Sequence, residues 1–234
     1  MEPGNGTPDS GVKERLQNLQ NRMCGLEAEH GRDVRSTHLL AVSKRHPVER
    51  IREAYAAGQS LFGENFVQEA LAKQRELGDC AIEWHFIGAI QSNKSADIAR
   101  HFSWVHTLAS AKVARRLSAA RPPELAPLNI LIQINISGES SKQGIEAADA
   151  PELVRLVSQL PRLRYRGLMT LPALAESEAE QRHAFSTLRE LASAMPAPFD
   201  TLSMGTSHDY AAAIAEGSTM VRLGTAIFGP RPMK

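Results

Sequence analysis

The sequence has few cysteines, few aromatic residues and almost no net charge, and these shortages exclude several classes of protein. Cys24 and Cys80 are the only cysteines in 234 residues, too few for a disulfide framework and without metal-ligand spacing. The 27 basic residues oppose 26 acidic ones, so the chain lacks the basic excess expected of a nucleic-acid-binding protein. Reduced thiols in a cytoplasmic protein are the simplest interpretation.

The sequence also lacks a long apolar stretch. No run approaches the roughly 20 residues that a helix needs to cross a bilayer, so we expect no membrane partner. Residues 1–9 are rich in Gly, Pro and Asn and contain no apolar segment like that of a signal peptide. We therefore predict a disordered extension over residues 1–9, one domain over residues 10–234, and a cytoplasmic location.

The pattern that the sequence does show is an alternation of short apolar runs rich in β-formers with segments of helical period. The eight runs predicted as strands are 38–43, 61–63, 84–88, 104–108, 129–136, 165–171, 201–204 and 220–224. Helices are predicted near 48–57, 66–77, 92–101, 110–120, 149–160, 176–194 and 209–216, with an extra amphipathic helix at 10–30 before the first strand.

Strands that alternate with helices indicate βα units and a parallel sheet. Eight such units could close into a barrel or form an open, doubly wound sheet. We favour a single (β/α)8 TIM barrel, because there are eight units and no Gly-rich dinucleotide loop follows the first strand. The length of 234 residues is also close to the roughly 250 residues typical of that fold.

Lys44 is the most informative residue of the predicted barrel mouth. Working residues of such barrels stand at the C-terminal ends of the strands, and Lys44 directly continues the apolar run 39–42. Desolvation in the mouth would favour the neutral amine, the form that attacks an aldehyde to give a Schiff base. The alternative is a lysine at a strand end that simply reaches solvent.

The segments after strands seven and eight predict an anion site. Gly205, Thr206 and Ser207 precede a predicted helix and could present backbone N–H groups and hydroxyls to an anion. Gly224 and Thr225 could do the same, and barrels often bind phosphate at these two loops. Such residues are also ordinary in loops, so the prediction depends on their combination with a lysine after strand one.

Arg222 interrupts the apolar run 220–224, so its side chain either faces outward or places a guanidinium inside the mouth. A surface arginine is an unattractive interpretation for a strand of a closed barrel. A guanidinium beside a pyridine nitrogen would disfavour protonation of that nitrogen, whereas an aspartate would favour it.

At these residues the chain resembles the pyridoxal phosphate homeostasis protein family, also called the proline synthetase co-transcribed or YggS family. The resemblance covers roughly residues 12–230. Its motifs are Leu40–Lys44, Phe62–Glu69, Glu83–Gly88, Gln91–Lys94, Val105–Leu108, Gln133–Ile136, Ser141–Gly144, Arg166–Met169, Leu202–Gly205, Ser207–Asp209 and Gly217–Gly229.

The resemblance implies an alanine-racemase-like barrel that binds pyridoxal 5′-phosphate (PLP). Lys44 matches the family's PLP lysine, Arg222 matches the arginine near the pyridine nitrogen, and Asn65 lies in a motif that lines the cofactor. The residues in its phosphate-binding segments are Ser203, Gly205, Ser207, Gly224 and Thr225. The implied function is to buffer or deliver PLP in intracellular vitamin B6 homeostasis, with PLP-requiring apo-enzymes as recipients and no established turnover.

Two residues depart from the family pattern. Thr206 stands where methionine or another apolar residue is common, and it either adds a hydroxyl near the phosphate or, as we expect, fills space. Ala89 stands where proline is usual and should loosen the loop after strand three, because a constraint on φ is removed. Neither departure affects Lys44.

A PLP-dependent amino-acid racemase is the alternative function, since related enzymes use this barrel. Racemization needs a base on each face of the α-carbon, and in alanine racemase the second base is a tyrosine from an all-β domain. The sequence ends at Lys234, so we expect no such domain, and because the barrel can close alone we expect a monomer. Tyr210 opens a predicted helix, so His208 is the conceivable substitute base, although we expect a structural or helix-capping role for it. A cofactor-free interaction module would leave Lys44, the anion-binding loops and Arg222 unexplained.

Other polar residues of the strands and helices have simpler interpretations. His85 and His106 lie in strand runs, so we expect satisfied core histidines there, and no metal site is predicted. The run Lys112–Arg116 is expected to form a solvated helix face.

Overall fold

Eight parallel strands form a closed barrel, as the alternation in the sequence predicts. The computed structural model describes residues 11–138, 143–173, 175 and 177–230, so the extension predicted over residues 1–9 lies outside the described part. Strands adjacent in the chain are adjacent in the barrel, and β8 returns to β1. The strands are β1 (His38–Val42), β2 (Leu61–Glu64), β3 (Glu83–Phe86), β4 (Trp104–Leu108), β5 (Leu128–Ile134), β6 (Leu163–Thr170), β7 (Thr201–Ser203) and β8 (Met220–Leu223).

Barrel closure brings the first and last strands together. His38–Ala41 of β1 pairs in register with Met220–Leu223 of β8, and the same strand pairs with β2 on its other side. The strand bodies are buried, with Leu40 and Ile132 fully inaccessible to solvent. This pairing places the end of β1, where Lys44 follows, next to the end of β8, where Arg222 and Gly224 lie.

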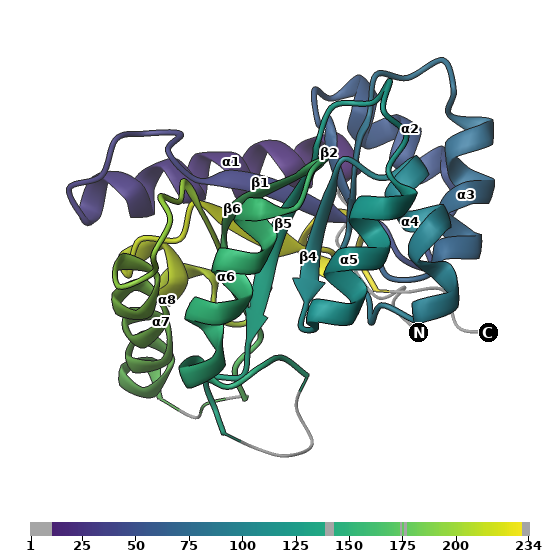
Figure 1. Cartoon of the computed structure of the whole chain (residues 1–234). Helices are drawn as coiled ribbons and strands as arrows, with labels where there is room; N and C mark the ends of the chain where they lie inside the picture. Colours follow the sequence, from purple (N-terminus) through teal and green to yellow (C-terminus); the bar gives the residue numbers. More distant parts are fainter. Residues whose placement is uncertain (1–10, 139–142, 174, 176, 231–234) are drawn as a thin grey trace, which may run out of the picture.

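Helices follow the strands and cover the outside of the barrel (Figure 1). They are α1 (Val12–Glu29), α2 (Val48–Ala56), α3 (Val67–Glu76), α4 (Ser95–His101), α5 (Ala111–Ala120), α6 (Ala150–Gln159), α7 (Glu178–Ser193), α8 (Tyr210–Ala215) and α9 (Thr225–Phe228), with 3-10 turns η1 (Ser92–Lys94) and η2 (Ala147–Asp149). Among the described helices, none is both long and apolar enough to span a membrane.

The extra N-terminal helix α1 is confirmed, and it packs against α2, α8 and α9. Leu16, Leu19 and Met23 are buried, at the spacing of three and four residues that gives a helix one apolar face. Near its C-terminal end, the buried carboxylate of Glu27 accepts a hydrogen bond from the backbone N–H of Thr37 at 2.6 Å. This contact joins α1 to the residue just before β1.

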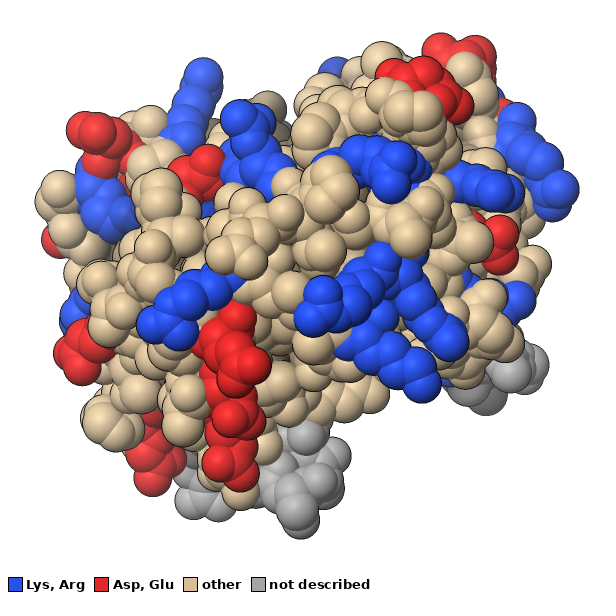
Figure 2. Space-filling model, in the orientation of Figure 1, with Lys and Arg blue, Asp and Glu red and all other residues tan. Residues whose placement is uncertain are grey.

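The face shown in Figure 2 carries charged side chains of both signs, with a group of Lys and Arg over α5 and a column of Asp and Glu over α6. The run predicted as a solvated helix face lies on α5. Lys112, Arg115 and Arg116 are exposed there, while Val113 and Ala114 between them are buried. That prediction is confirmed.

Three details differ from the sequence-based prediction. The helix predicted over 92–101 begins as the 3-10 turn η1 and becomes α-helical only at Ser95. Strand β3 ends at Phe86 instead of Gly88. Gly88 lies in the following loop, against the segment after β2, where a Cβ would lie 2.0 Å from the carbonyl oxygen of Asn65. Helix α9 was not predicted, since four residues are too short to show a helical period.

Candidate functional site

A cavity of about 230 Å³ lies at the C-terminal ends of the strands. This is the end of a (β/α)8 barrel where binding sites form. Six of the eight residues predicted to bind the cofactor line this cavity. They are Lys44, Asn65, Ser207, Arg222, Gly224 and Thr225. Residues separated by up to about 180 positions in the chain therefore meet at one place.

Lys44 lies in a tight turn that directly follows β1, and its side chain is half-buried. The next residue, Arg45, has a φ of 63°, and the N–H of His46 donates to the carbonyl of Ser43 at 3.0 Å. The backbone N–H of Arg45 also donates to the carboxylate of Glu69 on α3. The turn is thus held from both ends, and Lys44 projects toward the cavity from a rigid support.

A buried ion pair lies beneath this turn, and the sequence analysis missed it. The ammonium of Lys73 donates to the Ser43 carbonyl at 2.8 Å, to Glu64 at 2.7 Å and to Glu69 at 2.6 Å. Burial raises the pKa of Glu64, and the nearby charge of Lys73 opposes that rise. A signal was available, because Lys73 continues the three-residue spacing of the buried positions Val67 and Ala70 on α3.

The segment after β7 forms a capped turn on one side of the cavity. Gly205 has a φ of 97°, and a Cβ there would lie 2.6 Å from the Cβ of Ala213, so the position requires glycine. The backbone N–H and the hydroxyl of Thr206 both donate to Asp209, at 2.6 and 2.9 Å. The departure at Thr206 therefore supplies a hydroxyl that stabilises the turn, which neither interpretation from the sequence foresaw.

The segment after β8 presents the start of a short helix to the same cavity. Gly224 precedes α9, which begins at Thr225. The first N–H groups of any helix have no carbonyl partner within the helix, so they suit an anion. A Cβ at Gly224 would lie 3.0 Å from the carbonyl oxygen of Val42, so the absence of a side chain at Gly224 suits the close approach of this segment to the end of β1.

Arg222 points into the barrel, which settles the alternative left open by the sequence. Its guanidinium donates to the hydroxyl of Ser203 at 2.7 Å and to the carbonyl of Thr170 at 2.8 Å. The residue is 4% exposed, and burial lowers the pKa of its guanidinium to about 10. Arg222 stays charged at neutral pH and forms one wall of the cavity.

Two predicted residues lie behind the cavity wall. Ser203 is fully buried and contacts Arg222 and His106, while the carbonyl of Gly205 accepts from the backbone N–H of Arg222. Both residues support Arg222, whereas Ser207 lines the cavity itself. The side-chain oxygen of Asn65 also lies at the cavity and is buried without a hydrogen-bond partner among the described residues.

The histidines expected in the core are confirmed as satisfied core residues. His85 and His106 are fully buried and hydrogen-bonded to each other at 2.9 Å. Among the described residues there is no group of three His, Cys, Asp or Glu side chains that could hold a metal ion.

Comparison with known proteins decides the family. The family described as the alanine racemase N-terminal domain matches residues 15–232. The pyridoxal phosphate homeostasis protein of Pseudomonas aeruginosa is 50% identical over 222 residues, which cover 95% of this chain and 96% of that protein. The chain belongs to the pyridoxal phosphate homeostasis protein family.

Solved structures agree with this family membership. The PipY protein of Synechococcus elongatus, solved with PLP bound, is 36% identical to this family member with a TM-score of 0.81, over 93% of this chain and 100% of that one. An alanine racemase of Clostridium difficile is 15% identical with a TM-score of 0.72, over 97% of this chain and 58% of that one. The second likeness concerns the fold alone.

Proposed function

We propose that this chain binds PLP as a Schiff base on Lys44 and buffers or delivers it in vitamin B6 homeostasis. The observation that carries the proposal is that Lys44 and Arg222 line the same cavity, in a fold whose relative PipY has been solved with PLP bound. PLP supplies an aldehyde that condenses with a primary amine. The residues of the chain must supply the amine, hold the phosphate and face the ring nitrogen.

The residues around the cavity fit such a group. Ser207, Gly224 and Thr225 would hold the phosphate at the turn after β7 and the start of α9. Arg222 would face the ring nitrogen and, as a charged donor, keep it unprotonated. The buried side-chain oxygen of Asn65, which has no hydrogen-bond partner in the part of the chain that the structure describes, offers one more acceptor that a bound molecule can satisfy.

We further propose that the chain holds PLP and does not racemize amino acids. A racemase needs a second base opposite the lysine. Among the described residues that line the cavity there is no tyrosine, and the ring of buried Tyr210 lies under the guanidinium of Arg22 from α1. His208 does line the cavity and is exposed, so it is the residue to test as a substitute base.

The test of binding is chemical. The purified protein loaded with PLP should be yellow, and borohydride reduction should attach the cofactor to Lys44, as peptide mass spectrometry would show. A Lys44→Ala variant should stay colourless, whereas Lys112→Ala, an exposed lysine on α5, should be as yellow as the parent. A yellow Lys44→Ala variant labelled at no other lysine would refute the proposal.

Two further measurements distinguish a protein that holds and delivers PLP from an enzyme that racemizes amino acids. Incubation with alanine, serine or glutamate should give no racemization. Turnover that both Lys44→Ala and His208→Ala abolish would establish an enzyme instead.

Delivery is tested by reactivation of a PLP-requiring apo-enzyme with loaded protein and with free PLP at the same concentration. We also propose a monomeric, cytoplasmic protein, which size determination and cell fractionation would check.

A further inference from the structure

A continuous chain of hydrogen bonds runs through the barrel interior to Arg222. The carboxylate of Glu83 contacts Nε2 of His85 at 3.0 Å, and Nδ1 of His85 contacts Nε2 of His106 at 2.9 Å. Nδ1 of His106 contacts the hydroxyl of Ser203 at 3.0 Å, and that hydroxyl accepts from Arg222 at 2.7 Å. The chain crosses strands β3, β4, β7 and β8 before it reaches the cavity.

The two ends of this chain lie in different environments. His85, His106 and Ser203 are fully buried, so the middle of the chain is shielded from water. Glu83 is the first residue of β3, and its side chain is 44% exposed at a second cavity of about 510 Å³ toward the N-terminal ends of the strands. The chain therefore connects the solvent-accessible end of β3 with the cavity at the opposite end of the barrel.

The chemistry of the end groups dictates the direction of each hydrogen bond. A carboxylate only accepts, so Nε2 of His85 must carry the hydrogen that meets Glu83. Nδ1 of neutral His85 then accepts from Nε2–H of His106, and Nδ1 of His106 accepts from the Ser203 hydroxyl. The Ser203 oxygen is left to accept from Arg222, which can only donate. Every group is satisfied with both histidines neutral.

We propose that Glu83 is a positioning residue that acts through this chain. Glu83 fixes one end of the hydrogen-bond chain by accepting from His85, and Arg222 fixes the other end because it can only donate. Together they give the three hydrogen bonds between Glu83 and Ser203 one direction, which leaves the Ser203 oxygen to accept from Arg222. The guanidinium is then held in one orientation at the cavity wall. The consequence for a bound ring nitrogen rests on the proposed PLP function, whereas the direction of the chain does not.

The charges around the chain support this direction. Burial lowers the pKa of His85 and lowers that of His106 well below the ordinary value, so both rings stay neutral. The hydrogen bond from His85 lowers the pKa of Glu83, so its carboxylate stays charged. The charged and titratable groups whose charges act on the members of the hydrogen-bond chain are Arg166 on Glu83, His38 on His85, Arg222 on His106 and Asp209 on Arg222.

Nitrogen-15 NMR of the cofactor-free protein tests the direction. His85 and His106 should both carry their hydrogen on Nε2, with resonances that do not titrate from mildly acidic to mildly alkaline pH. Assignment comes from the loss of each signal in His85→Gln and His106→Gln. If the unmodified protein carried the hydrogen on Nδ1 of either histidine, that result alone would overturn the proposal, and no variant at Glu83 would be needed.

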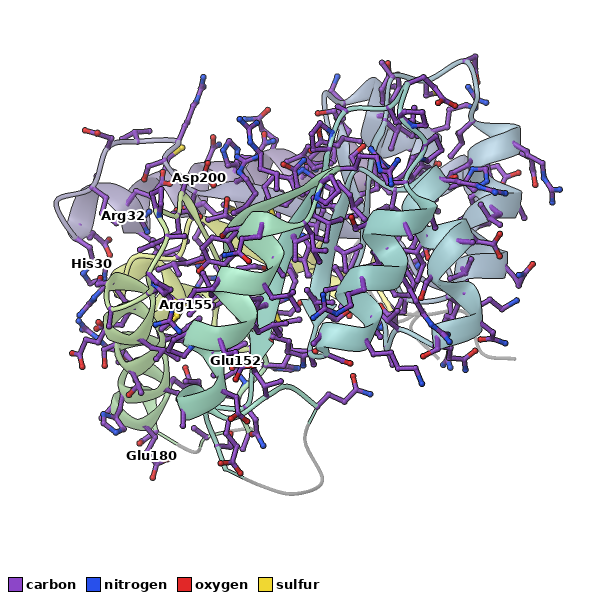
Figure 3. The ribbon with its side chains drawn as sticks, in the orientation of Figure 1. His30, Arg32, Glu152, Arg155, Glu180 and Asp200 are labelled. Carbon is purple, nitrogen blue, oxygen red and sulfur yellow. The ribbon has the colours of Figure 1, made fainter. Side chains whose placement is uncertain are left out.

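The role of Glu83 is tested through the tautomer of His106, a residue that Glu83 does not contact. In Glu83→Ala the acceptor at one end is gone and only Arg222 still orders the hydrogen bonds, so a second tautomer of His106, with the hydrogen on Nδ1, should become detectable. The matched control is Asp200→Asn, which removes a carboxylate from the same N-terminal cavity but not from the chain (Figure 3). Native-like His106 signals in a folded Glu83→Ala variant would refute the role, because local support of His85 alone would leave His106 unchanged.

The loaded protein gives a separate readout. If the ring nitrogen faces Arg222, Glu83→Ala should shift the pH profile of the PLP absorbance, and Asp200→Asn should not. An unshifted profile would overturn the coupling to the cavity. Failure of the protein to bind PLP at all would instead refute the proposed function, and the tautomer measurement would still decide the direction of the chain.

Discussion

The ammonium of Lys73 lies 2.7 Å from the carboxylate of Glu64, in a buried pair directly beneath the turn that carries Lys44. Lys73 also holds the carbonyl of Ser43, the last residue before Lys44. A lysine that does not line the cavity thus supports the turn of the one that we propose to hold the cofactor. Its removal would leave Glu64 as a buried carboxylate without a counter-charge from Lys73, held by the Ser43 hydroxyl at 2.7 Å.

Lys73→Met should therefore destabilise the protein by about 3–5 kcal/mol, the usual cost of breaking a buried ion pair on one side. Denaturant unfolding measures this cost, and Lys112→Met on the exposed face of α5 should change stability by less than about 0.5 kcal/mol. The double variant Lys73→Met with Glu64→Gln should recover part of the loss. A single variant as stable as the parent would contradict the support assigned to Lys73.

The destabilisation by Lys73→Met should depend on pH. Burial already raises the folded-state pKa of Glu64, and the loss of Lys73 removes the opposing charge. A glutamate with a raised folded-state pKa favours the folded state at low pH, and that contribution is lost as the pH rises through the folded-state value. The deficit of the variant should therefore shrink as the pH falls through the raised folded-state pKa of Glu64 toward the ordinary glutamate range, which unfolding curves from neutral to acidic pH would show.

Much of the fold follows from local patterns, because each strand and helix carries its own periodicity. β1 and β8 are clear as apolar runs, and the polar residues at their ends locate the site once the eight units are closed into a barrel. The pairing of Lys73 with Glu64, and of His85 with His106, depends instead on side chains from different units. Single-segment patterns do not encode such tertiary contacts, so these residues had to be seen in the structure.

Gly205→Ala and Gly58→Ala form a matched pair that separates steric contact from backbone strain. Both glycines have a similar positive φ, 97° and 95°, but a Cβ at Gly58 meets nothing within 4 Å, while one at Gly205 lies 2.6 Å from Ala213. Each variant should lose about 1 kcal/mol to strain, and Gly205→Ala should lose a further 1–3 kcal/mol to overpacking. Equal losses in thermal unfolding would contradict the packing assigned to the turn after β7.

Thr206→Val tests whether the hydroxyl that departs from the family pattern stabilises the turn. The valine keeps the volume but loses the hydrogen bond to Asp209, so stability should fall by about 1 kcal/mol. Thr206→Ser keeps the hydroxyl and should stay closer to the parent. If Thr206→Val and Thr206→Ser were equally stable in denaturant unfolding, the hydroxyl would have no stabilising role, and space filling would remain as the explanation.

Arg222→Lys tests the need for a forked donor at the cavity wall. The guanidinium bridges the Ser203 hydroxyl and the Thr170 carbonyl, and a single ammonium on a different stem cannot reproduce that geometry. One buried acceptor would lose its partner, at a cost of about 1–3 kcal/mol. Arg32→Lys is the matched control, because Arg32 (labelled in Figure 3) donates to one carbonyl, that of Ile214, outside the cavity.

PLP-loaded Arg222→Lys should remain yellow through Lys44 but bind PLP more weakly and show an altered absorbance profile with pH. Unchanged binding and spectrum would mean that Arg222 does not face the cofactor.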